Sequence, residues 1–92
     1  MAKSIIQDKK ECYVTHTTQG LHLHHCIYGA NRKNSDKYGL VVWLHYEFHT
    51  GKYGVHNGNK ELDSELKELA QRKFEEIYGH DKFMEIFKKN YI

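Results

Sequence analysis

The chain has 92 residues and a formal net charge of +2 with its histidines neutral. A chain of this length makes one small domain that buries about 60–65% of the surface its unfolded form exposes, so a bound metal or partner would add stability. It has no apolar stretch of about 20 residues and no apolar N-terminal segment. We therefore expect neither a membrane helix nor a secretory signal, and we expect a cytoplasmic protein.

Histidine is the unusual residue of this composition. The chain has eight histidines, and seven of them lie between His16 and His56. Its two cysteines, Cys12 and Cys26, form one disulfide at most, and inside a cell they are more typical of free thiols or metal ligands. The mildly basic charge is compatible with a nucleic-acid partner.

The first half of the chain alternates short apolar and polar segments. Residues 21–27 alternate in hydropathy and predict a strand. The Gly, Asn, Ser, Asp and cations of residues 28–38 predict a loop. The apolar residues 39–44 predict a second strand, and residues 45–50 a short helix that stops at Gly51.

The second half predicts helices. Residues 60–92 are rich in Lys, Glu, Leu and Phe, and their apolar side chains follow the three- to four-residue spacing of one helix face. Gly79 is a stop signal, and Asp81 is positioned to cap a short last helix. The expected buried face consists of Leu62, Leu66, Leu69, Ala70, Phe74, Ile77 and Tyr78.

The histidines in the first half have the spacing of a metal site. On a helix, His45 and His49 project from the same face with Cβ atoms about 5–6 Å apart, close enough to share one ion. His24 and His25 end the preceding strand. Strict alternation sends these two side chains to opposite faces, so they share a site only if the strand twists or ends there. His56 is either a further ligand or a turn residue.

Several segments together resemble a known family, the small HNH endonucleases of phages and prophages. The segments are Leu21-His-Leu-His-His25, Ala30-Asn-Arg-Lys-Asn-Ser35, Tyr38-Gly-Leu-Val-Val-Trp-Leu44, His49 and Gly54-Val-His56. The resemblance implies an α+β fold with a small, treble-clef-like ββα-metal hairpin-helix core followed by C-terminal helices. Residues 1–92 would form a single domain, with the core in 1–58 and the helical segment in 59–92.

The resemblance also implies a division of roles. His25 would be the general base of a metal-dependent DNA endonuclease that hydrolyses phosphodiester bonds. His24 and His49 would hold one divalent metal ion, and His56 and His45 are further candidate ligands. Imidazole favours Zn, Ni, Co or Mn, whereas Mg would keep several waters.

Two loop residues are further candidates for the reaction. Because no Asn stands where the second strand begins, Asn31 or Asn34 would orient the base. Arg32 is suited to a forked contact with a phosphate oxygen. DNA would be bound with little sequence preference, since no base-reading motif is present. Expected backbone contacts are Lys33, Lys37, Lys52 and Lys60.

A structural zinc, which many such nucleases carry, would have few ligands in this chain. Thr15 stands where the second cysteine of the N-terminal pair belongs, and Phe48 stands at the matching helix position. Cys12 and His45 are the ligands that remain, and a closed zinc site needs four.

A rebuilt zinc site suggests a second function. The protein would then be a non-catalytic, zinc-stabilised module that binds nucleic acid or protein through a degenerate HNH fold. A rebuilt site would recruit His16 or Cys26. A closed set of four ligands would consist of Cys12, Cys26, His45 and His49. A third possibility is a helical–β domain whose histidines are surface residues without a functional role.

Overall fold

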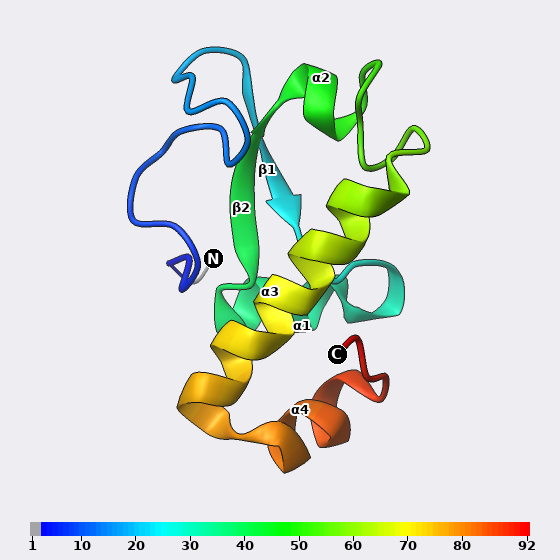
Figure 1. Cartoon of the computed structure of the whole chain (residues 1–92). Coiled ribbons are helices and arrows are strands. Elements are labelled where there is room, and N and C mark those ends of the chain that lie inside the picture. The colour runs from blue at the N-terminus through cyan, green and yellow to red at the C-terminus, as the bar shows by residue number, and fades with distance from the viewer. Residues whose placement is uncertain (1–2) are drawn as a thin grey trace.

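The fold is α+β, built from a two-stranded antiparallel sheet and helices (Figure 1). The computed structural model describes residues 3–92. Within them the elements are β1 (Leu21–His25), the 3₁₀ turn η1 (Gly29–Asn31), α1 (Arg32–Tyr38), β2 (Val41–His45), α2 (Tyr46–His49), α3 (Lys60–Tyr78) and α4 (His80–Phe87). This order is compatible with a ββα fold. None of the helices in residues 3–92 is long and apolar enough to cross a membrane.

The segment expected to be a loop between the strands is helical, so that prediction is wrong. Its polar residues lie on the exposed side of α1, while the buried Ser35 ties the helix to the end of β1. The Ser35 hydroxyl donates to the Ile27 carbonyl and accepts from the Ile27 N–H. The helix ends at Tyr38 and is followed by Gly39, whose φ of 72° is left-handed and where a Cβ would collide with the Lys3 carbonyl oxygen.

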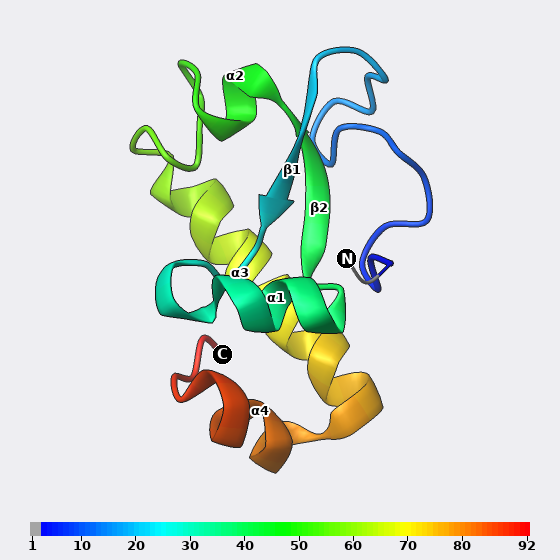
Figure 2. The same ribbon diagram turned by 180° about the vertical axis from the view of Figure 1, so that it is seen from behind.

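The sheet is short, and its outer edge is covered. Residue pairs run from Leu21 opposite His45 to His25 opposite Val41. The N-terminal segment follows the free edge of β2 (Figure 2), where the Tyr13 N–H donates to the Trp43 carbonyl over 2.8 Å. This cover satisfies backbone groups that an open edge strand would leave unpaired.

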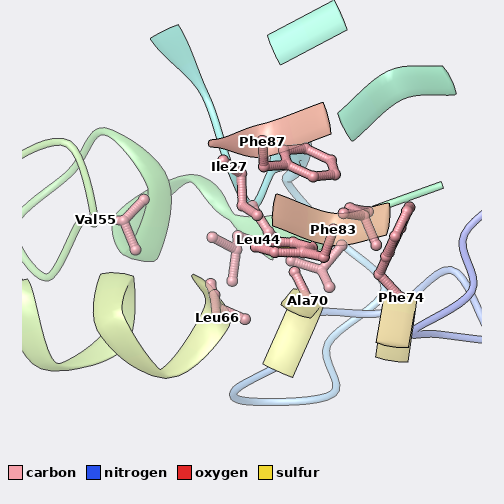
Figure 3. Packing of buried hydrophobic residues seen from close by; sticks show 11 residues of the cluster. Ile27, Leu44, Val55, Leu66, Ala70, Phe74, Phe83 and Phe87 are labelled. Atoms are coloured by element: carbon pink, nitrogen blue, oxygen red, sulfur yellow. The ribbon is translucent and has the colours of Figure 1, made fainter. Parts of the chain in front are cut away.

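The core joins the sheet to the C-terminal helices (Figure 3). Leu66, Ala70 and Phe74 of α3 are fully buried, as their spacing predicts, and Phe83 and Phe87 of α4 close over Phe74. This packing fixes α3 against the strands that carry the histidines.

Two details of the helical half differ from expectation. Ile77 and Tyr78, expected on the buried face, are 57% and 42% exposed and do not belong to the core, because the apolar stripe turns away from the sheet near the end of α3. Gly79 rather than Asp81 precedes α4 as its N-cap, and Asp81 lies in the first turn without a capping role.

Candidate metal centre

Three histidines from three separate segments converge beside β1. His24 lies near the end of β1, His49 is the last residue of α2, and His56 lies in the turn that follows. One ligand nitrogen from each lies within 4.8 Å of the other two. The turn is held on α2 because the His56 N–H donates to the His49 carbonyl over 3.0 Å. This group could hold a metal ion.

The state of His24 fits a metal ligand. Its ring is 1% exposed, and among residues 3–92 its Nε2 is the one buried side-chain nitrogen or oxygen without a hydrogen-bond partner. Such an atom is costly unless something pairs with it. Burial, and after it the nearby His49 and His56, lowers the pKa of His24 to about 3. The ring is therefore neutral at pH 7, as coordination requires.

The pKa of His49 is lowered for similar reasons. Burial is the main cause that lowers its pKa, and the neighbouring His56 and His22 act in the same direction. Protonation of one ring opposes protonation of the next, because the rings lie within a few ångströms of one another. The centroid of the His49 ring is 5.4 Å from that of His24 and 4.8 Å from that of His56.

The three histidines open onto a cavity of about 260 Å³. Its walls come from β1, the turn before η1, the start of α1, the end of α2 and the turn after it. The lining residues are Leu23, His24, His25, Tyr28, Arg32, His49 and His56. Arg32, expected to contact phosphate, is thus brought to the same cavity as the histidines.

His25 lines this cavity without belonging to the three-histidine group. Its Nε2 lies 3.0 Å from Oδ1 of Asp36 on α1. The hydrogen bond from His25 is the main cause that lowers the pKa of Asp36, so the carboxyl is ionised at neutral pH and only accepts. His25 therefore donates from Nε2, which leaves the lone pair on Nδ1.

Asp36 takes the place that the sequence suggested for an asparagine. The Asn31 amide donates to the Phe87 carbonyl over 3.1 Å, and its oxygen accepts from Asn34 over 3.1 Å. Asn31 thus bonds to α4 and to Asn34, and the hydrogen-bond partner of His25 is Asp36, so the expectation that Asn31 or Asn34 orients His25 is corrected. The contact of Asp36 with His25 was not predicted, because residues 28–38 were expected to form a loop rather than the helix that carries Asp36.

His45 does not join the three histidines. It is the last residue of β2 and the N-cap of α2, where its Nδ1 accepts from the Glu47 N–H over 3.3 Å. Its ring packs on Tyr46, with centroids 4.2 Å apart. The expected pairing of His45 and His49 on one helix face is wrong, because the helix begins only after His45.

The cysteine-based zinc sites are not assembled either. Cys12 and Cys26 are buried free thiols, and burial raises the pKa of Cys26. Cys26 packs in the apolar core, while His49 faces His24 and His56. In the part of the chain that the structure describes, the three-histidine group is the sole converging set of three or more potential ligands. The four-ligand set is therefore not formed. Cys12 lies against the backbone of His45, and no third ligand among the described residues converges with them.

Tyr28 supports the group from the side of α3, a contact that the sequence did not suggest. Its ring centroid lies 4.9 Å from that of His56, and its hydroxyl donates to Asp63 over 3.0 Å. Lys67 donates to the same carboxylate over 2.8 Å and lies over the Tyr28 ring. The long helix thus fixes one wall of the cavity.

Comparisons with known proteins find no matching family model, no similar curated protein and no similar solved structure. The function of the site is therefore inferred from its geometry and chemistry alone.

Proposed function

We propose that the protein is a metal-dependent DNA endonuclease of the HNH type. The observation that carries the proposal is the contrast between adjacent residues of β1. His24 converges with two other histidines, whereas His25 pairs with a carboxylate, and both line one cavity. A metal site beside a histidine that is not a ligand would supply both a Lewis acid and a general base, the two groups that phosphodiester hydrolysis uses here.

The metal-binding residues support a catalytic centre better than a closed structural one. His24, His49 and His56 offer three nitrogen donors. Three protein ligands leave coordination positions open for water or phosphate, whereas a structural zinc site is closed by four. A divalent cation bound there would act as a Lewis acid toward the phosphate. Zn, Ni, Co and Mn suit these donors, and Mg would require additional water ligands.

His25 would be the general base. The carboxylate of Asp36 accepts from its Nε2, so the unprotonated Nδ1 takes a proton from the attacking water. A neutral imidazole accepts a proton through the lone pair of its unprotonated ring nitrogen. Asp36 then stabilises the imidazolium that forms, as a carboxylate does behind a histidine base elsewhere.

Arg32 would hold the substrate. It is exposed at the start of α1 and lines the cavity. Its planar guanidinium is suited to two parallel hydrogen bonds to a phosphate. Exposed lysines would add contacts to the DNA backbone, which implies binding that weakens with salt and carries little sequence preference. These lysines are Lys33, Lys37, Lys52 and Lys60.

Cleavage of supercoiled plasmid tests the proposal. The wild-type protein is incubated with Mg, Mn, Ni or Zn, each with an EDTA control, beside His25→Ala and His25→Asn. We expect nicking that requires metal and falls by about 10²- to 10⁴-fold in both variants, with metal content unchanged. His80→Ala is the matched control, since His80 is exposed and pairs with Glu75 on the helical side.

Two results would contradict the proposal. One is the absence of cleavage with every metal by a folded protein. The other is cleavage by both His25 variants at the wild-type rate, which would reject His25 as the base.

A further inference from the structure

A fourth histidine contacts the metal-binding group from outside. His22 lies two residues before His24 on β1, so both side chains belong to the same face of the strand. Its Nδ1 lies 3.1 Å from the Nδ1 of His49, and the two rings are nearly perpendicular at 86°. The distance is that of a hydrogen bond between two imidazoles.

This contact decides which nitrogen of His49 is available to a metal. A neutral imidazole carries one N–H, so only one of two bonded Nδ1 atoms holds a proton. If His49 donates, its Nε2 is unprotonated and able to bind a cation. If His49 accepts, its Nε2 carries the proton and cannot. Metal binding through Nε2 of His49 therefore selects the arrangement in which His22 accepts.

His22 does not have the placement of a direct ligand. It is absent from the set of residues whose ligand atoms converge within 4.8 Å, and it does not line the cavity. Its ring is exposed, so water can satisfy the proton that its own Nε2 then carries. The bond to His49 is the contact by which His22 reaches the site.

We propose that His22 is a positioning residue of the metal centre, which accepts from Nδ1 of His49 and so holds that ring with Nε2 toward the ion. The inference rests on the proposed metal site and adds to it the group that orients one ligand. Metal-binding histidines generally donate their second N–H to such a partner, and loss of the partner weakens metal binding by about 10- to 100-fold.

Metal affinity tests this role without reference to cleavage. Wild type, His22→Ala, His22→Asn and His49→Ala are titrated with Zn in competition with a chromophoric chelator, and circular dichroism verifies their folding. We expect one ion per chain, with binding weakened about 10- to 100-fold in His22→Ala and partly restored in His22→Asn, whose amide oxygen can accept. His80→Ala is the control and should bind as wild type does.

Nitrogen NMR of the zinc-loaded wild type supplies a second measurement. We expect the ring proton of His49 on Nδ1 and the metal on Nε2. Unchanged affinity in His22→Ala, or a proton on Nε2 of His49, would overturn the role of His22 and leave the nuclease proposal standing. A loss in His22→Ala as complete as in His49→Ala would make His22 a direct ligand. A folded wild type that binds no metal would overturn both proposals.

Discussion

His25 and Asp36 are joined by a hydrogen bond of 3.0 Å between the last residue of β1 and the middle of α1. Because Asp36 lies on α1, the placement of this short helix beside the end of β1 determines where the Asp36 carboxylate meets the His25 ring. The bond fixes the tautomer of His25 and leaves Nδ1 as its basic atom. The segment between the two strands therefore contributes to the proposed chemistry as well as to the fold.

Replacement of Asp36 by asparagine should slow cleavage. Asp36→Asn keeps the size of the side chain but removes the charge that stabilises a protonated His25, so we expect plasmid nicking to fall by about 10- to 100-fold. Metal content should not change, because Asp36 is outside the three-histidine group. Asp81→Asn, an exposed carboxyl on α4, is the control. Wild-type nicking by Asp36→Asn would show that the carboxylate has no part in the reaction.

The two arginines of the chain provide a matched pair for DNA binding. Arg32 lines the cavity, whereas Arg72 is exposed on α3 and does not. Arg32→Ala should weaken binding to duplexes of any sequence and reduce the slope of log affinity against log salt by about 1, the value for one phosphate contact. Fluorescence anisotropy across a salt series measures both effects. Equal losses in Arg32→Ala and Arg72→Ala would mean that general charge, rather than the cavity, binds DNA.

The stability of the metal-free protein should fall in acid. The pKa of His24 is about 3 in the folded chain and about 6.5 in the unfolded chain. Between pH 3 and pH 6.5 the unfolded chain therefore binds a proton on His24 that the folded chain does not bind, which favours unfolding. The stabilisation is therefore complete above pH 6.5 and is lost as the pH falls toward 3. The lowered pKa values of His49 and Asp36 act in the same direction.

Urea unfolding from pH 7.5 to 4 measures this effect. Each tenfold change in proton affinity is about 1.4 kcal/mol, so the free energy of unfolding should drop by several kcal/mol over the series. A protein equally stable at pH 7.5 and pH 4.5 would contradict the buried, neutral state of His24.

The core gives a prediction independent of the metal. Phe74 is fully buried and contacts Phe83, Phe87 and Tyr38, so Phe74→Ala should cost about 3–5 kcal/mol of unfolding free energy. Ile77→Ala on the same helix should cost under about 0.5 kcal/mol, because Ile77 is 57% exposed. Chemical denaturation measures both. Similar losses in the two variants would contradict the orientation of α3.

The sequence predicted the elements with strong periodicity. Both strands, the division near Gly79 and the burial of Leu66, Ala70 and Phe74 follow from apolar spacing, and the structure confirms them. It did not predict α1, because polar residues on a solvent-exposed helix have the same composition as a loop. The contact of Ser35 with Ile27 that fixes this helix is tertiary and leaves no local signal.

The candidate site was predicted only in part, because some of its contacts depend on tertiary structure. His24 and His49 were expected to share a site, and the structure brings them together with His56. His45 was misplaced because the start of α2 was set one residue too early, which turned an N-cap into a helical position. The Asp36 contact depends on how α1 crosses the end of β1, which the spacing of residues along the chain does not encode.

The most direct test of the whole account is the amount of metal bound at equilibrium. Dialysis against Zn or Co followed by elemental analysis should give one ion per chain for the wild type. We expect His49→Ala and His56→Ala to weaken binding by more than about 100-fold, beyond the loss of an outer partner. His45→Asn, which keeps an N-cap, should retain the ion. A folded wild type that binds no ion, or a loss in His45→Asn as large as in His49→Ala, would contradict a metal centre built on His24, His49 and His56.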